Sequence, residues 1–448
     1  MLLRILNVFL THLELYCLLM RVFLKSALFL LCALPSAALA QGQPDAPSSE
    51  LSVRVLIASG SALELQIPFQ HSMFYPDGRL LYRSETAVSW PLSVSKAGNV
   101  VINGTDGGSP KIYIPEGAPG TTMTLRGSSY RGGMLIRVVG GGLQLINVVG
   151  LEDYLYSVVP AEMPPTWSLE ALKAQAVIAR TYAVSRLSPK ADFDLCATQQ
   201  CQVYPGVSKE SERSSQAVML TRGQIVAWNG KPAQTFFSSD NGGWTASASE
   251  VWGMKLPYSV AQPDPFSKSP KSTWQISLPW SRASSIASAY GKVGTLSSVR
   301  VSSYSNSGRP LELTLTGSDG KAVVKGAEAG GFVKSLGGYS TRVAFGSNAD
   351  GLVMAGAGYG HGVGLSQYGA QGMAGAGYDY LYIMGFYFPK ARIGQYVIAG
   401  NNLPNTVARI AARVESSTFK IVKNPFESFS SAVWSSSAWS SPELPFQG

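Results

Sequence analysis

The chain has 448 residues, of which 45% are hydrophobic and 14% charged, and its net charge at neutral pH is +9. This length and composition allow two or three packed units and exclude an intrinsically disordered chain. A cationic protein suits an anionic or polysaccharide-rich partner. Nucleic acid is not an expected partner, because the Lys and Arg residues are scattered along the chain and form no basic cluster.

Residues 1–40 are expected to be a signal peptide. Leu, Phe, Val and Ala dominate them, and "LPSAALA" ends in the small-x-small pattern that a signal peptidase accepts. Met20, ahead of Arg21 and Lys25, is an alternative start. The apolar run 26–34 is shorter than the roughly 20 residues that a spanning helix needs. We therefore expect export to the periplasm, cell wall or extracellular space, with membrane contact only through an uncleaved leader.

The remaining chain is expected to have an α+β architecture, a β-rich scaffold with inserted motif helices. Residues 41–50 resemble a linker. Between 51 and 149, "LSVRVLIA" and "ALELQIPF" alternate apolar and polar residues and "NGTDGG" supplies a turn, which predicts a β-rich unit. Residues 150–400 are expected to form the core that carries the motifs, and 401–448 a C-terminal extension with a Ser-rich tail.

Two helices are expected at the start of this core. The first covers "LEDYLYSVV", with Glu152 and Asp153 in its first turn as surface or capping residues, and Pro160 is expected to end it. The second begins near Ser168, a residue typical of N-caps, and runs to about Leu187.

Glu162 is expected in the loop between these helices. Apolar neighbours such as Met163 and Trp167 would desolvate its carboxyl group and raise its pKa, which suits a general acid. Lys173 and Arg180 share one face of the second helix, toward a groove or solvent, and either cation would lower that pKa again. The residues alone leave the outcome open.

Two cysteines remain beyond the leader, Cys196 and Cys201, in "DLCATQQCQVY". In an oxidising compartment a disulfide is the leading hypothesis. Zinc is the alternative, although two thiolates without a nearby histidine fall short of the three or four protein ligands that zinc takes.

Residues 356–364, "GAGYGHGVG", place glycine at every second position. In an extended backbone one face would carry no side chains, while His361 projects from the other. Either another strand or a sugar chain would then approach the bare face. His361 is a candidate site residue because its neighbours are too small to form an apolar packing shell, whereas His71, far from the other motifs, is expected to be structural.

Glu162 is the single clear candidate for an acid catalyst, which limits the ways in which the protein could cleave a glycosidic bond. Most glycosidases use two carboxylates, and only Asp240 and Glu250 could supply the second, so two-carboxylate hydrolysis is disfavoured. A single acid suffices when a hydroxyl of the sugar replaces water as the nucleophile. The acid protonates the leaving oxygen and then, as a base, takes the hydroxyl proton. Muramic acid residues of peptidoglycan allow this reaction, which yields an anhydro product.

Successive segments resemble the blocks of the SpoIID/LytB family, within residues 51–396. They are "LEDYLYSVVPAEMPPTWSLEALKAQAVIARTYA", "CQVYPG", "FFSSDNGGWTASASEVWG" followed by "PYS", and "GYGHGVGLSQYGAQGMA". The resemblance implies an elongated glycan-binding groove. It also implies a lytic transglycosylase that cleaves MurNAc-GlcNAc bonds in strands denuded of stem peptides, as in the sporulation members. The alternative is a non-catalytic enhancer of an N-acetylmuramoyl-L-alanine amidase.

Carried over residue by residue, the family's catalytic acid corresponds to Glu162. The residues that the resemblance expects to line the glycan groove are Lys173, Gln175, Arg180, Thr181, Tyr182, Gln202, Tyr204, Ser239, Gly242, Gly243, His361 and Gln367. Some members bind zinc through a histidine upstream of two cysteines, but "SPKADFDLC" has none. No cofactor is therefore expected, the zinc ligand set is incomplete, and the disulfide is favoured.

Overall fold

The computed structural model describes residues 51–270, 272–396 and 422–423. The expected signal peptide, linker and Ser-rich tail lie outside these residues. Within the described ranges, no helix has both the length and the apolar character needed to cross a bilayer. Residues 51–150 contain strands and no helix, and the rest of the described chain combines helices with further small sheets, which confirms the predicted β-rich α+β class.

Residues 51–150 supply nearly all strands of two sheets, whose inner faces contribute to one hydrophobic core. Alternation decides which side chains enter it: Leu63, Leu65 and Ile67 are buried, while the residues between them are exposed. The seven-stranded sheet has the order β13 (Leu195–Cys196), β1 (Ser52–Gly60), β12 (Gly142–Gly150), β11 (Gly133–Val139), β8 (Lys111–Ile114), β3 (His71–Phe74) and β4 (Leu80–Ser84). The six-stranded sheet has the order β10 (Ser128–Tyr130), β9 (Met123–Leu125), β2 (Leu63–Ile67), β5 (Val88–Val94), β6 (Val100–Ile102) and β7 (Thr105–Asp106).

His71 lies inside this β-rich unit, in agreement with its expected structural role. Its Nδ1 lies 2.8 Å from the carbonyl oxygen of Phe69, and its Nε2 accepts a hydrogen bond from Trp90 at 2.8 Å. Both ring nitrogens are therefore engaged by the unit's own residues.

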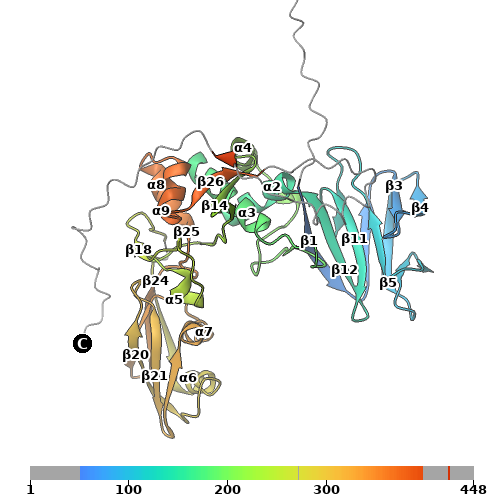
Figure 1. Cartoon of the computed structure of the whole chain (residues 1–448). Helices are drawn as coiled ribbons and strands as arrows, with labels where there is room; N and C mark the ends of the chain where they lie inside the picture. The colour runs from blue at the N-terminus through green and yellow to red at the C-terminus, as the bar shows by residue number, and fades with distance from the viewer. Residues whose placement is uncertain (1–50, 271, 397–421, 424–448) are drawn as a thin grey trace, which may run out of the picture. The chain divides into compact units, whose positions relative to one another are not determined.

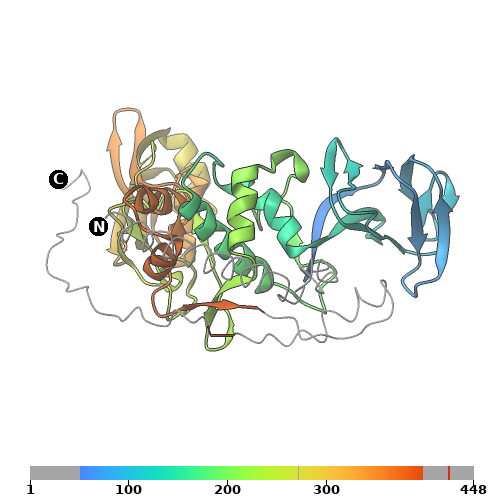
Figure 2. The same cartoon turned by 90° about the horizontal axis from the view of Figure 1, so that it is seen from above.

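The helical core begins directly after β12 (Figure 1). Helix α3 is its centre, because it contacts α2, α4, α8, α9 and strand β14; the green helices α2, α3 and α4 lie together in the second view as well (Figure 2). Small side chains such as Ala176, Ala179 and Ala183 are fully buried on α3 and allow this close approach. The elements are α2 (Leu151–Glu162), α3 (Leu169–Val184), the 3-10 helix η1 (Val207–Lys209), α4 (Glu212–Leu220), α8 (Gln367–Gly375), α9 (Tyr380–Tyr387), and a sheet of β15 (Lys231–Pro232), β14 (Gln224–Trp228), β26 (Arg392–Gln395) and β27 (Val422–Lys423).

The first helix is longer than the sequence predicts. Pro160 does not end α2, because a proline removes only its own N–H from the ladder, and the Met163 N–H still donates to the Val159 carbonyl at 3.0 Å. Glu162 is therefore the last residue of a helix, and the expectation that it lies in a loop is wrong.

Residues 273–357 build a second hydrophobic core of their own, with buried side chains such as Leu313, Leu315 and Phe332. The elements are β19 (Thr273–Pro279), α6 (Trp280–Ala287), β20 (Leu296–Tyr304), β21 (Pro310–Gly317), β22 (Gly320–Lys325), α7 (Ala327–Ser335), β23 (Val343–Asn348) and β24 (Gly351–Ala357).

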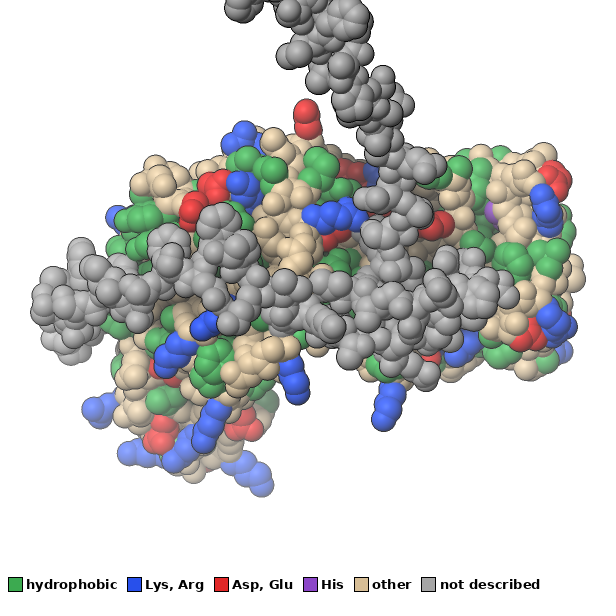
Figure 3. All heavy atoms as spheres, turned by 45° about the horizontal axis from the view of Figure 1, so that its top comes forward, with side chains coloured by type: hydrophobic (Ala, Val, Ile, Leu, Met, Phe, Trp, Pro, Cys, Tyr) green, Lys and Arg blue, Asp and Glu red, His purple; other side chains and the backbone are tan. Residues whose placement is uncertain are grey.

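Short elements connect this second core to the helical core. They are β16 (Phe237–Ser238), β17 (Trp244–Thr245), α5 (Ala248–Trp252), β18 (Gln262–Pro263) and β25 (Leu365–Ser366). On the face drawn in Figure 3, outside the grey atoms, Lys and Arg side chains are spread among polar and apolar ones.

Candidate functional site

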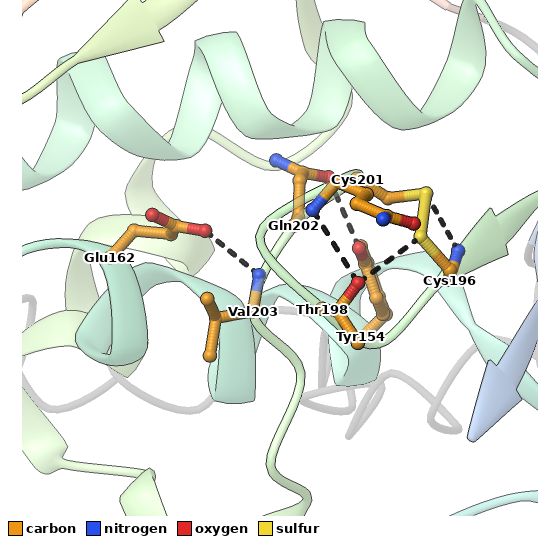
Figure 4. Close-up of a disulfide and its surroundings, with 8 residues drawn as sticks. Tyr154, Glu162, Cys196, Thr198, Cys201, Gln202 and Val203 are labelled. Carbon is orange, nitrogen blue, oxygen red and sulfur yellow. Dashed lines mark hydrogen bonds between the residues drawn. A yellow bond between two sulfur atoms is a disulfide. The ribbon is translucent and has the colours of Figure 1, made fainter. Parts of the chain in front are cut away.

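Glu162 lies where three segments of the chain meet. Its Oε1 accepts a hydrogen bond from the backbone N–H of Val203 at 2.8 Å, as Figure 4 shows. Its backbone carbonyl accepts a hydrogen bond from Nε2 of Gln367, at the start of α8, at 3.0 Å. The helix end, the segment after Cys201 and the start of α8 are thus joined at one residue, Glu162.

The environment of Glu162 favours the protonated carboxyl group. Burial raises the pKa of Glu162, and the Val203 N–H, which stabilises the anion, only partly opposes this effect. The position at the C-terminal end of α2 acts in the same direction as burial, because the helix dipole is negative there.

Lys173 and Arg180, the two cations that could have lowered the pKa of Glu162, form ion pairs with other residues. Lys173 Nζ lies 2.6 Å from Glu170 Oε1, and Arg180 Nη2 lies 2.6 Å from Glu152 Oε2. Neither lowers the pKa of Glu162, so burial determines its direction. The partners follow from helix spacing for Lys173 and from the packing of α2 on α3 for Arg180.

Several residues predicted to line the groove lie in the interior. Arg180 is 0% exposed, so the prediction that it faces a groove or solvent is wrong, as is the surface role expected for Glu152, which is 1% exposed. Thr181 Oγ1 donates to the Val177 carbonyl at 2.6 Å and accepts from the Val226 N–H at 2.8 Å. Both Arg180 and Thr181 therefore connect α3 to its neighbours.

Three further residues expected to line the groove are buried, on α3 and in the segment after the cysteines. Gln202 is buried, and its Oε1 accepts from the Tyr154 hydroxyl at 3.1 Å (Figure 4). The hydroxyl of Tyr204, also buried, donates to Asn147 Oδ1 at 2.8 Å. Gln175 is fully buried, and neither its side-chain oxygen nor its nitrogen has a hydrogen-bond partner within the described ranges.

Cys196 and Cys201 are joined in a disulfide, with their Cα atoms 5.4 Å apart. The bond closes the short loop immediately before Gln202 and Val203, so it fixes the backbone that supplies the hydrogen bond to Glu162 (Figure 4). Over the residues that the structure describes, no group of three or more His, Cys, Asp and Glu side chains is arranged to hold a metal ion.

Neither candidate for a second catalytic carboxylate is available. Asp240 is fully buried and accepts from Gly242 N–H at 2.8 Å and from the hydroxyl of Ser267 at 2.7 Å, among others. Glu250 closes a capping box with Ser247 at the start of α5. Their structural roles agree with the sequence argument against two-carboxylate hydrolysis.

Sequence reasoning missed the buried carboxyl group of Asp264. It accepts hydrogen bonds from Tyr387 Oη and Asn241 Nδ2, both at 2.6 Å. Burial raises the pKa of Asp264 and these hydrogen bonds lower it. A carboxylate in a Pro-flanked loop has no periodic pattern that reveals such burial, and its partners are distant in sequence.

The glycine run is not an extended strand. Strand β24 ends at Ala357, and Gly358, Gly360, Gly362 and Gly364 all have positive φ angles between 71° and 113°. A Cβ at Gly360 would lie 2.6 Å from Ser238 Cβ, and one at Gly362 would lie 2.0 Å from Arg309 Nη2. Protein atoms, not a sugar, therefore approach these glycines.

His361 is packed by this same run. Its ring contacts Trp252 and Phe236, and its Nδ1 accepts the Val363 N–H at 3.0 Å. Burial lowers the pKa of His361 to about 4, assisted by the charges of Arg309 and Lys334. The imidazole is therefore neutral at physiological pH and serves the packing of this region.

The remaining predicted residues lie in the loop before α5. The backbone carbonyl of Ser239 accepts from the Tyr368 N–H at 3.0 Å. Gly242 and Gly243 have φ angles of 73° and 85°, and Arg342 Nη1 donates to the Gly242 carbonyl at 2.6 Å. The structure thus brings Gln367 and the backbone next to Gln202 to Glu162. His361 instead packs on aromatic rings, and the loop before α5 bonds to α8 and to Arg342.

The fold, the order of these segments and the comparison with known families agree. Residues 139–228 match the family described as SpoIID, stage II sporulation protein. The chain belongs to this family, as the resemblance of its motifs predicted.

Three relatives extend the match beyond those residues. An uncharacterized protein of Brachyspira hyodysenteriae is 34% identical over 278 residues, which cover 61% of this chain and 74% of that protein. Stage II sporulation protein D of Bacillus subtilis is 31% identical, over 56% of this chain and 76% of that protein. The amidase enhancer of Bacillus subtilis is 32% identical, over 54% of this chain but only 40% of that protein.

Proposed function

We propose that this protein is a lytic transglycosylase that cleaves peptidoglycan glycan strands between MurNAc and GlcNAc. One observation carries the proposal: Glu162 is a partly buried carboxyl group whose pKa is raised, and in the described part of the chain no Lys or Arg forms an ion pair with it. Membership of the SpoIID family supports the choice of substrate class.

In the proposed reaction Glu162 acts twice. Its carboxyl group first donates a proton to the glycosidic oxygen as the bond between this oxygen and the anomeric carbon of MurNAc breaks. The resulting carboxylate, stabilised by the Val203 N–H, then accepts the proton of a hydroxyl group of the same MurNAc as that oxygen bonds to the anomeric carbon. The products are an anhydro-muramyl end and a new GlcNAc end. The reaction consumes no water and needs no metal or cofactor.

The proposal includes where the protein works. Peptidoglycan lies outside the cytoplasmic membrane. To reach this substrate, the protein must be exported to the periplasm, cell wall or extracellular space. The expected signal peptide supplies that route. Direct partners would be glycan strands and, in one version of the function, an amidase.

A second candidate is a non-catalytic protein that binds glycan and enhances an amidase. It is favoured by the similarity to the amidase enhancer of Bacillus subtilis. Both candidates predict glycan binding, whereas only the first predicts anhydro ends.

The distinguishing experiment replaces Glu162 by Gln, which keeps the size and a hydrogen-bond acceptor for Val203 but removes the transferable proton. Wild type and variant are incubated with denuded and with intact glycan, and anhydro-muramyl ends are counted by mass spectrometry. Loss of an acid catalyst lowers the rate about 10²- to 10⁴-fold. Glu116→Gln is the matched control, because Glu116 is exposed.

A glycan pull-down and a melting curve accompany the assay. Glu162→Gln should bind glycan and should be no less stable than wild type at neutral pH, since ionising a buried carboxyl group is unfavourable. Equal release of anhydro ends by wild type and Glu162→Gln contradicts the catalytic assignment. Binding without any release by the wild type favours the amidase enhancer.

A further inference from the structure

The Cys196–Cys201 disulfide lies directly before the N–H group that binds Glu162. Val203 donates this hydrogen bond at 2.8 Å, and only Gln202 separates Val203 from Cys201 (Figure 4). A movement of Cys201 therefore reaches the hydrogen bond through two peptide bonds. Because peptide bonds are planar and stiff, little of such a movement is absorbed on the way.

The two cysteines are anchored in different ways. Cys196 belongs to the seven-stranded sheet, because β13 pairs with β1 and the N–H of the next residue, Ala197, donates to the Leu56 carbonyl at 3.1 Å. Cys201 lies outside the strands and helices, and its N–H donates to the Thr198 carbonyl at 2.9 Å within the loop itself. The disulfide thus joins the start of the segment 201–203 covalently to the sheet.

The rest of this segment has contacts that do not depend on the disulfide. The Tyr154 hydroxyl donates to Gln202 Oε1 at 3.1 Å, and the Tyr204 hydroxyl donates to Asn147 Oδ1 at 2.8 Å, all between buried residues. A disulfide that closes so short a loop also restricts the unfolded chain little. Breaking the disulfide is therefore expected to loosen the backbone next to Val203 while the fold persists.

Reagents in solution can reach the disulfide. Both cysteines are partly exposed, and residues 198–200 between them are exposed. A thiolate of a dithiol can attack one sulfur and form a mixed disulfide, and the second thiol of the reagent then releases the remaining cysteine. Two electrons and two protons pass to the protein, so that the S–S bond becomes two thiol groups and the dithiol becomes a cyclic disulfide.

We propose that this disulfide is a redox control of Glu162: the oxidised form holds the Val203 N–H against the carboxyl group, and reduction by a dithiol releases it. The effect on the carboxyl group is independent of the reaction, whereas the effect on cleavage rests on the proposed function. In that reaction Glu162 becomes a carboxylate, which the Val203 N–H stabilises. Reduced protein should therefore cleave glycan more slowly.

Reduction should also raise the pKa of Glu162. Burial raises this pKa and the Val203 N–H lowers it, so loss of the hydrogen bond removes the opposing effect. No charged side chain in the described ranges contributes to this pKa. The charge of Glu162 acts on the phenols of Tyr154 and Tyr182, but burial raises the pKa of both, so they stay neutral where a carboxyl group titrates. The pKa of Glu162 thereby reports on this hydrogen bond.

The test compares oxidised protein with protein reduced by dithiothreitol. Alkylation of free thiols and intact mass establish the redox state of each. The pKa of Glu162 is measured by NMR of protein labelled with ¹³C at its glutamate carboxyl groups, in which the Glu162 signal is the one absent from Glu162→Gln. After reduction we expect a higher pKa and a release of anhydro ends slower by about tenfold or more, and both should recover on reoxidation.

Two variants control for other effects of the reagent. Protein with both Cys196→Ser and Cys201→Ser should behave like reduced protein and should not respond to dithiothreitol. The matched control is Gln199→Ala, which alters the exposed loop but keeps the disulfide, and it should respond as wild type does. Melting curves establish whether each form is folded.

Equal pKa values of Glu162 in the two redox forms overturn the inference, as does equal cleavage by oxidised and reduced protein. Unfolding on reduction, or of the double serine variant, also overturns it, because the disulfide would then stabilise the whole fold rather than control one hydrogen bond. Failure of the proposed function is distinguishable. A wild type that releases no anhydro ends, but whose Glu162 pKa rises on reduction, contradicts the catalytic proposal and supports the role of the disulfide.

Discussion

The end of α2 and the glycine run at residues 356–364 each hold a titratable side chain away from water, with opposite results. At Glu162, burial raises the pKa of an acid whose side chain accepts one hydrogen bond, from a backbone N–H, within the residues that the structure describes. At His361, burial and two nearby cations lower the pKa of a base to about 4, while aromatic rings and the Val363 N–H occupy the imidazole. Both groups are therefore neutral over a wider pH range than in water.

The two side chains differ in how many hydrogen-bond acceptor positions remain free for a ligand. An ionised carboxylate offers about four acceptor positions, so Glu162 keeps unused acceptor positions beside the Val203 N–H. A neutral imidazole offers one acceptor, and His361 uses it for its own backbone. A perturbed pKa thus indicates a reactive group at Glu162 and a packed group at His361, although both are among the residues carried over from the family.

The largest expected effect on stability comes from the region of Glu162. Arg180→Met removes the buried guanidinium that pairs with Glu152, and breaking a buried ion pair by removing one partner typically costs about 3–5 kcal/mol. Urea unfolding measures the change. If Arg180→Met unfolds like wild type but loses glycan binding, Arg180 contacts substrate after all and the two regions are less distinct than described.

A smaller loss of stability is expected when a glycine of the glycine run is substituted. Gly362→Val combines an unfavourable φ of 73° with a clash against Arg309, and about 2–4 kcal/mol of stability should be lost. The matched control is Gly243→Val, which has a φ of 85° but no atom within 4 Å of the added Cβ, and only the backbone strain should appear. Equal losses in the two variants would show that the contact with Arg309 contributes nothing.

Local patterns in the sequence predicted the elements that depend on local chemistry. Helix α3 begins one residue after Ser168, as the N-cap preference predicts, although the Ser168 side chain forms no cap hydrogen bond. The alternating strands of the β-rich unit were equally predictable. Glu162 was identifiable from its apolar neighbours and from the family motif, and its pKa direction matches the desolvation argument.

Long-range contacts account for what the sequence did not predict. Glu152 and Arg180 are 28 positions apart, and Glu162 and Val203 are 41 apart, so no spacing rule pairs them. The glycine run was interpreted as extended because alternation is typical of strands, but its glycines are needed for positive φ and for close approach of the chain.

The smallest and most selective effect is the pH dependence that His361 contributes. Its pKa in the folded protein, about 4, is below its ordinary value of 6.5, so the unfolded chain binds the proton more readily. The stability due to neutral His361 is fully present above about pH 6.5 and is lost as the pH falls from there toward 4. In His361→Asn the side-chain oxygen can still accept the Val363 N–H, but no proton binds.

Urea midpoints measured at pH 7 and pH 4.5 should therefore fall further in wild type than in His361→Asn. Other titrating groups, Glu162 included, cancel in this comparison because both proteins contain them, and the Glu162 contribution has the opposite sign, since its raised pKa makes protonation stabilising. Equal falls in the two proteins would mean that His361 is hydrated and able to take up a proton in the folded state, in which case the contrast with Glu162 fails.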